Sequence, residues 1–199
     1  MTPRLSALAL ALWTGPALAE CPTADDLSGA GITMTHADGA SDFLIAGEPG
    51  TVRAIVRFPH GFGGNNVYAR GVHLLQLMDV WDGAPDLESL RLFDYGMAPT
   101  DLPEPTPGLS WEADYQVTSG PDTAPERQVQ SWGALEERRF GDCTYQVIPG
   151  EIVYSYIDGS HTEGMLYFPD LGVSFLTSWQ DGSMARPDIF VLEALHVGP

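Results

Sequence analysis

The chain has 199 residues, and 44% of them are hydrophobic, which is normal for a folded protein and excludes wholesale disorder. It carries 27 acidic residues against nine basic ones, all of them arginine, for a formal net charge of −18. Such a surface repels nucleic acid phosphates and anionic lipid headgroups, so DNA and RNA are excluded as partners. Net charge bears first on solubility, so the acidity is not taken as evidence for a cationic partner.

Residues 1–19 have the pattern of a secretory signal peptide. A short positive start is followed by an uncharged stretch rich in Leu and Ala, and the sequence ALA at 17–19 has the small-x-small form of a cleavage site. The apolar stretch is too short to span a bilayer as a helix, which takes about 20 residues. We expect cleavage after Ala19 rather than lipid attachment at Cys21, because the charged Glu20 precedes that cysteine. The prediction is a periplasmic or secreted protein with no transmembrane segment, and the alternative is an uncleaved N-terminal anchor.

The mature chain holds two cysteines, Cys21 and Cys143. In an exported protein two cysteines are most simply paired in a disulfide, and one that closes so long a loop is structural. There is no Cys-x-x-Cys pair and no His-x-x-x-His pair, which are the spacings that metal sites use. We therefore predict a Cys21–Cys143 disulfide, with no metal and no cofactor.

After Cys21, the sequence TADD at 23–26 is typical of a capping box and predicts a short helical turn. From there, apolar residues rich in Val, Ile, Tyr, Phe and Trp alternate with polar ones, which is the pattern of half-buried strands. The predicted strands cover residues 32–36, 52–58, 72–80, 90–93, 111–117, 152–157, 173–179 and 189–195.

Four Asp-Gly pairs lie between these strands, at 38–39, 82–83, 158–159 and 181–182. Asp-Gly suits the two central positions of a type I′ hairpin turn. The sequence thus predicts an all-β fold, an antiparallel β-sandwich or a strongly curved or closed barrel of about 9–11 short strands. We place it in a single domain over residues 20–199.

Two segments interrupt the strand pattern. Residues 97–109 (MAPTDLPEPTPGL) hold four prolines, which favour an extended course, either a crossover between two β-meanders or a linker. Residues 59–71 (PHGFGGNNVYARG) predict a long hairpin loop in which glycine and asparagine supply positive φ. The alternative is a binding loop, and its candidate residues are His60, Phe62, Asn65 and Asn66.

Aromatic residues in the polar central region give a second candidate surface, formed by Trp111, Tyr115 and Trp132. Tryptophans beside carboxylates are typical of sugar-binding or peptide-binding surfaces, and core packing is the alternative, which explains most such residues.

No catalytic residue is predicted, because the chain has no Gly-x-Ser-x-Gly motif and its five histidines are scattered. The first interpretation is an exported, non-enzymatic β protein that acts by binding or by envelope assembly. Its partner would be an envelope protein, a glycan or a small molecule, and its oligomeric state stays open. One alternative is a hydrolase or isomerase whose acids and histidines converge only in three dimensions. The other is a carrier of an apolar ligand in a β-barrel.

Overall fold

The structure is a computed structural model that describes residues 21–199, so the predicted signal peptide at 1–19 lies outside the described residues. The described chain is nearly all β, as the period-two pattern predicts. The first half comprises α1 (Ala24–Leu27), β1 (Ile32–His36), β2 (Ser41–Ala46), β3 (Thr51–Arg57), β4 (Phe62–Ala69), β5 (His73–Leu77), β6 (Asp79–Trp81), β7 (Ala84–Pro85), the 3-10 turn η1 (Leu87–Ser89) and β8 (Arg91–Asp94). The second half comprises β9 (Ser110–Ser119), β10 (Asp122–Trp132), β11 (Glu136–Phe140), β12 (Cys143–Tyr156), β13 (Gly159–Phe168), β14 (Val173–Asp181), β15 (Asp188–Ile189) and β16 (Leu192–Val197).

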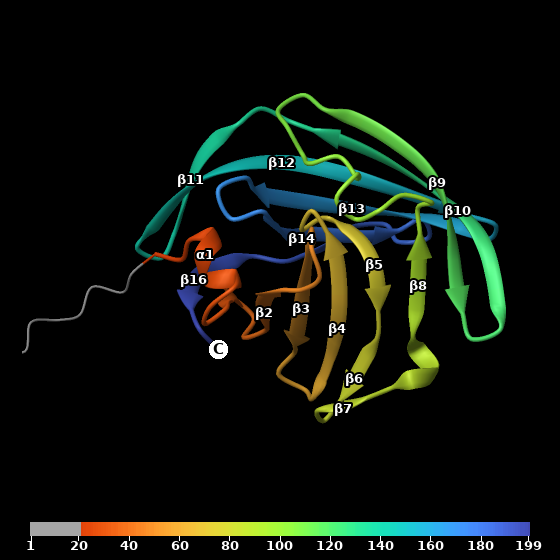
Figure 1. The fold of residues 1–199 in the computed structure, drawn as a ribbon, viewed down its shortest axis with the longest axis horizontal. Coiled ribbons are helices and arrows are strands. Elements are labelled where there is room, and N and C mark those ends of the chain that lie inside the picture. The colour runs from red at the N-terminus through yellow and green to blue at the C-terminus, as the bar shows by residue number, and fades with distance from the viewer. Residues whose placement is uncertain (1–20) are drawn as a thin grey trace, which may run out of the picture.

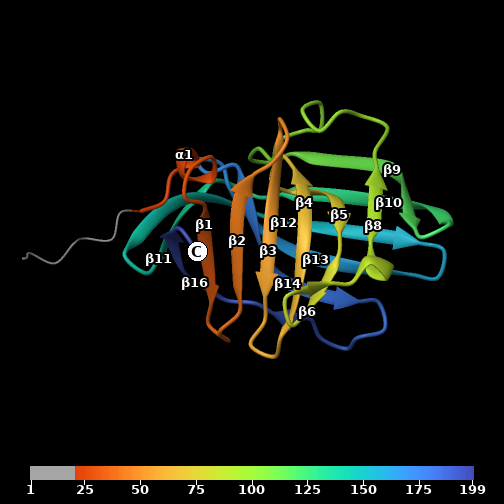
Figure 2. The same ribbon diagram turned by 60° about the horizontal axis from the view of Figure 1, so that its bottom comes forward.

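The sixteen strands form one antiparallel sheet, and it folds back on itself. Its main path runs β15-β14-β13-β12-β10-β9-β8-β5-β4-β3-β2-β1-β16, with β6, β7 and β11 attached at the side. The strands from β1 to β5 make one layer, and β9, β10 and β12 to β14 make a second layer whose strands cross the first (Figures 1 and 2). The result is a sandwich of two crossed layers, in which residues on the inner faces of both form the core.

The sheet is not closed into a barrel, although one segment touches both of its ends. Phe190 donates its backbone N–H to Thr177 at the β14 end, and Val191 accepts from the N–H of Ala37 beside β1. The next residues enter β16, which pairs with β1 from Ile32 onward. The chain between β15 and β16 therefore holds the two outer edges near each other.

Two clusters of buried apolar residues fill the space between the layers. The first joins α1, β1 and β2 to β12, β13 and β14, and Ile32, Met34 and Phe168 in it are fully buried. The second lies under β9, β10 and β12, around Tyr115 and Ile152. Both clusters draw on both layers, so the two halves of the chain share one interior.

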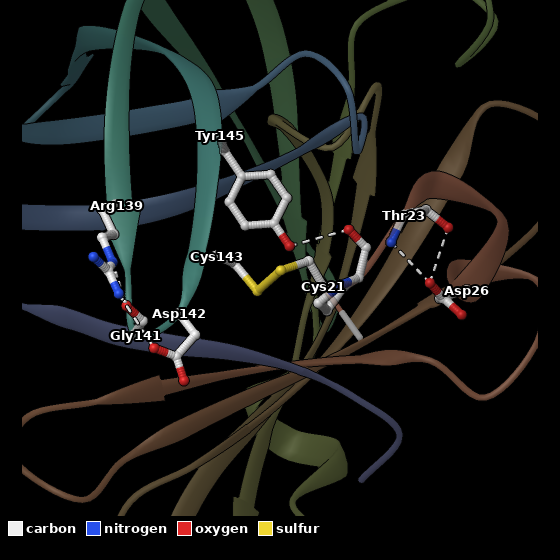
Figure 3. Close-up of a disulfide and its surroundings, with 9 residues drawn as sticks. Cys21, Thr23, Asp26, Arg139, Gly141, Asp142, Cys143 and Tyr145 are labelled. Carbon is white, nitrogen blue, oxygen red and sulfur yellow. Dashed lines mark hydrogen bonds and ion pairs between the residues drawn. A yellow bond between two sulfur atoms is a disulfide. The ribbon is translucent and has the colours of Figure 1, made fainter. Parts of the chain in front are cut away.

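The predicted disulfide and the predicted helical turn are confirmed at the N-terminal end. Cys21 and Cys143 are bonded, with their Cα atoms 5.6 Å apart (Figure 3). Beside them, the hydroxyl of Tyr145 donates to the carbonyl of Pro22 at 3.0 Å, and α1 follows directly. These contacts hold the segment that begins at Cys21 against β12. Without them, a segment at the end of a chain tends to fray.

The proline-rich segment 97–109 leads from β8 to β9, which are neighbours in the sheet. The buried His73 holds this segment through hydrogen bonds. Its Nε2 donates to the carbonyl of Pro103 at 2.7 Å, and Nδ1 of the same ring accepts from Gln130 Nε2 at 3.2 Å. Trp132 Nε1 in turn donates to Gln130 Oε1 at 3.0 Å. Burial lowers the pKa of His73 to about 4, so the ring is neutral near pH 7 and serves to anchor this segment.

The structure corrects the predicted number of strands, because sixteen strands are present in the part of the chain that is described, not about 9–11. The missed strands include β10 and β11, and four of the five residues of β11 are charged. The inward positions of β10 are also partly polar, since Gln128 and Gln130 are almost completely buried. Buried glutamines weaken the apolar alternation on which a sequence-based strand prediction depends.

The prediction of a long hairpin loop at residues 59–71 is also wrong, because most of these residues form strand β4. Seven residue pairs join β4 to β3, from Thr51 with Ala69 to Arg57 with Gly63. Gly63 is extended there, and a Cβ at this position would lie 2.3 Å from the Val56 carbonyl oxygen, so glycine is required by close approach and not by positive φ. Of the four Asp-Gly pairs, only Asp82-Gly83 has positive φ at both residues, as a type I′ turn demands.

Candidate functional site

The two layers do not fill all of the space between them. A cavity of about 260 Å³ lies between β1 to β5 on one side and β12 to β14 on the other. Its walls are mainly apolar, with Leu44 and Ala54 from the first layer facing Met165 and Leu176 from the second. Because such side chains gain free energy only by contact with apolar atoms, the walls favour an apolar occupant over water.

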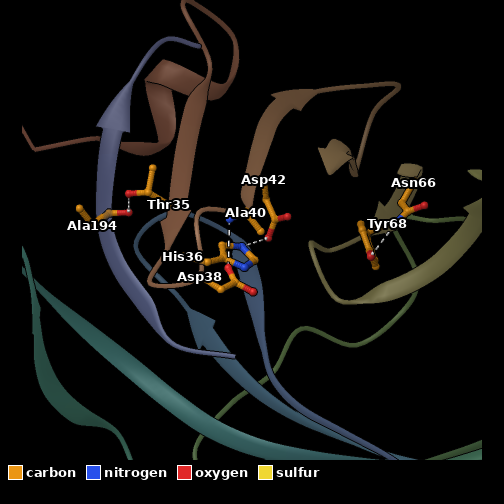
Figure 4. A network of polar contacts seen from close by, with 8 residues as sticks. All are labelled: Thr35, His36, Asp38, Ala40, Asp42, Asn66, Tyr68 and Ala194. Carbon is orange, nitrogen blue, oxygen red and sulfur yellow. Dashed lines mark hydrogen bonds and ion pairs between the residues drawn. The ribbon is translucent and has the colours of Figure 1, made fainter. Parts of the chain in front are cut away.

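A histidine–aspartate pair lies at one end of this cavity. His36 ends β1 and Asp42 follows on β2, and the hairpin between them brings His36 Nε2 within 3.1 Å of Asp42 Oδ2 (Figure 4). The backbone N–H of Ala40 donates to Asp38 Oδ1 at 3.0 Å and so fixes the turn. With Nε2 as the donor to the carboxylate, Nδ1 of His36 is a buried acceptor, and it has no hydrogen-bond partner among the described residues.

An amide–phenol pair stands on β4, two residues apart and therefore on one face of the strand. Asn66 Nδ2 donates to the hydroxyl of Tyr68 at 3.3 Å (Figure 4). Asn66 Oδ1 is buried and accepts no hydrogen bond within residues 21–199. Burial raises the pKa of Tyr68 well above its usual range, and the nearby charge of Glu163 raises it further, so this phenol is neutral.

The opposite wall presents a tyrosine and a glutamate from adjacent strands. Tyr154 on β12 pairs directly with His161 on β13, and their rings stack with centroids 4.5 Å apart. His161 Nε2 lies 3.6 Å from Glu163 Oε1. Burial, followed by the charge of Glu163, raises the pKa of Tyr154 well above its ordinary value. The polar groups that this wall presents to the cavity thus include the neutral phenol of Tyr154 and the carboxylate of Glu163.

Aromatic rings border the cavity at the end formed by β3, β4 and β6. Phe58 and Phe62 both line the cavity and stack with ring centroids 5.6 Å apart. Trp81 pairs with Phe62 across β6 and β4, their rings are 4.8 Å apart, and the indole is 55% exposed. Phe58 and Phe62 thus form an aromatic border to this part of the cavity, and Trp81 packs on Phe62 beyond it.

The structure divides the residues of the predicted binding loop into two groups. Phe62 and Asn66 line the cavity. His60 is exposed in the turn before β4, and Asn65 points to the other face of the strand, where its Oδ1 accepts from Arg53 at 3.4 Å.

The three aromatic residues of the central region all pack against the second core cluster and do not line the cavity. Tyr115 and Trp132 are buried, and the hydroxyl of Tyr115 donates to Glu126 at 2.8 Å. Trp111 is half-buried, with its ring centroid 4.9 Å from that of His73. Their positions are those of core residues that carry a polar atom.

Sequence reasoning missed most of the polar groups that the cavity collects, namely His36, Asp42, Tyr68, Tyr154 and Glu163. One local signal was present, since His36 and Asp42 flank the turn at Asp38-Gly39 and lie on the same face of the hairpin as diagonal neighbours. The other residues come from strands that are far apart in the sequence, and only the folding of the sheet brings them to one cavity.

Within residues 21–199, no group of three or more His, Cys, Asp or Glu side chains has the arrangement needed to hold a metal ion. No helix in that same range is long and apolar enough to cross a membrane. Comparison of the chain with protein families, with curated proteins and with solved structures finds no match.

Proposed function

We propose that this chain is an exported, non-enzymatic binding protein that holds a small, mostly apolar molecule between the two layers of its sheet. The observation that carries the proposal is the cavity, which has apolar walls contributed by both layers. A disulfide and a signal-like sequence at 1–19 support a periplasmic or secreted location.

The size of the cavity limits the ligand. An apolar cavity of about 150 Å³ holds benzene, so a cavity of about 260 Å³ accommodates roughly ten non-hydrogen atoms. That is a single substituted ring or a short chain, and it is smaller than a drug-sized ligand or a membrane lipid. Most of the binding free energy of such a molecule would come from its contact with Leu44, Ala54, Met165 and Leu176.

The His36–Asp42 pair is the one observation that favours the alternative, an enzyme using acid–base chemistry. A catalytic histidine needs a nucleophile, a water or a substrate proton within hydrogen-bond reach. In the described chain, the free nitrogen of His36 contacts no hydroxyl or thiol, and Ser174, which lines the same cavity, donates to the carbonyl of Gly71 at 2.6 Å. The pair thus fits a role in holding a ligand better than a role in attacking one.

Binding is tested by calorimetric titration with propylbenzene and 2-phenylethanol, two small neutral probes of the calculated size. Ala54 is almost completely buried and lines the cavity, so Ala54→Leu fills the space that the ligand needs. Ala124 lies exposed on β10, and Ala124→Leu is the matched control. If Ala54→Leu proves too crowded to fold, Val56→Leu adds a smaller volume to the same wall.

We expect the natural protein and the control to bind at least one probe, and the filled variant to bind at least about tenfold more weakly, because most of the apolar contact area is lost. Circular dichroism and urea unfolding establish that each variant is folded. Failure of both probes to bind, or equal binding by a folded Ala54→Leu protein, would contradict the proposal.

A further inference from the structure

Two residues that line the cavity carry buried hydrogen-bond acceptors that the protein leaves unused. His36 and Asn66 are each more than nine-tenths buried, with 8% and 9% of their surface exposed. With Nε2 as its donor, His36 bonds to Asp42, and Asn66 Nδ2 uses one of its two N–H groups on Tyr68. This leaves His36 Nδ1 and Asn66 Oδ1 without a donor from residues 21–199, and a buried acceptor without a donor is costly.

The charges around the cavity have one sign. Asp42 on β2, Asp79 on β6 and Glu163 on β13 all line it, and no arginine of the described chain does so. Within residues 21–199, Asp42 pairs with His36 and Glu163 pairs with His161, and neither carboxylate pairs with an arginine. The charges of Glu163 and Asp42 both raise the pKa of Tyr68, so the two carboxylates act on the same part of the cavity.

From these observations we propose that the ligand carries an amino group, so that the cavity selects small amphipathic amines over acids of the same size. This inference rests on the proposed function and specifies its ligand class. The ammonium hydrogens would be donated to Asn66 Oδ1 and His36 Nδ1, and the positive charge would lie between Asp42 and Glu163. Such a charge can be buried because opposite charges and acceptors replace its water.

The same groups disfavour an acid. A carboxylate offers only acceptors, so it would leave both unused acceptors unpaired and would add a fourth negative charge to the lining. Tyr68 and Tyr154 also line the cavity, and an aromatic ring attracts a cation over its face and repels an anion there.

The test compares four probes of nearly equal size and shape by calorimetric titration at pH 7: 2-phenylethylamine, 2-phenylethanol, propylbenzene and phenylacetate. We expect 2-phenylethylamine to bind at least about tenfold more tightly than phenylacetate, which is the effect of one charge-assisted hydrogen bond. 2-Phenylethanol should lie between them, because it can donate one hydrogen bond but carries no charge.

Variants locate the effect. Glu163→Gln keeps the shape of the side chain and removes its charge, and Asp42→Asn does the same on the opposite wall. Each should weaken the binding of 2-phenylethylamine about fivefold or more while changing that of propylbenzene less than about twofold. Glu151→Gln is the matched control. Glu151 is exposed on β12 and does not line the cavity, and its substitution changes the net charge by the same amount.

Three results would overturn the inference. If phenylacetate binds as tightly as 2-phenylethylamine, or if both charge-removing variants leave amine binding unchanged, the cavity does not recognise an amino group, although the proposed binding function stands. If neither propylbenzene nor 2-phenylethanol binds, the proposed function fails and the inference that rests on it fails with it.

Discussion

Replacement of both cysteines by serine tests how the N-terminal segment stabilises the fold. The disulfide joins residues separated by 122 positions. In the chain-entropy model, a closed loop of this length restricts the unfolded chain by about 5 kcal/mol at 25 °C. Native disulfides in small exported domains contribute about 2–5 kcal/mol, so we expect the double variant Cys21→Ser, Cys143→Ser to lose stability within that range.

Urea unfolding followed by circular dichroism measures the loss. With an m value of about 2 kcal/mol/M, the midpoint should fall by about 1–2.5 M. Tyr145→Phe is the comparison, because it removes only the hydrogen bond to Pro22 and keeps the disulfide, and it should cost about 1 kcal/mol. A double variant that unfolds at the same midpoint as the natural protein would refute the reasoning, and so would two free thiols in the natural protein denatured without reductant.

Two further predictions concern pH and export. Burial lowers the pKa of His73 to about 4 from 6.5, so between these pH values the unfolded chain binds more protons than the folded one. Stability therefore rises with pH across that window, and about 2 kcal/mol should be lost between pH 7 and pH 5. Urea unfolding at both pH values checks this, and His73→Gln should reduce the difference. The intact mass of the exported protein should match a chain that starts at Glu20 with two hydrogens fewer than the reduced form, whereas an acyl mass on Cys21 would contradict the assignment of the leader.

The Cys21–Cys143 disulfide, the helical turn α1 and the fold class could all be predicted from the sequence. Two cysteines have one simple pairing, and the residues TADD at 23–26 identify the start of α1 from local chemistry alone. In strands such as β1, buried Ile32 and Met34 alternate with half-buried threonines, so the period-two pattern that predicts a strand is complete.

Other features depend on tertiary structure and so could not be derived from local pattern. The sequence GGNN at 63–66 has the composition of a turn, yet pairing with β3 extends it into β4. Gln128 carries no apolar signal, although it is completely buried in β10.

The cavity was the least predictable feature, because its polar residues come from separate strands. Asn66 comes from β4 and Glu163 from β13, which meet only after the sheet has folded over. No spacing along the chain encodes that meeting, since it depends on how the whole sheet bends and on which side chains are small enough to leave space.

The most direct test of the central claim, that a small molecule binds between the two layers, is nuclear Overhauser contact between a bound probe and the protein. With ¹³C-labelled protein and 2-phenylethanol, we expect contacts from the probe to the methyl groups of Met165 and Leu176 on one wall and Leu44 on the other. Contacts confined to exposed residues such as Ile157 or Val129, or no contacts at saturating probe, would contradict the claim.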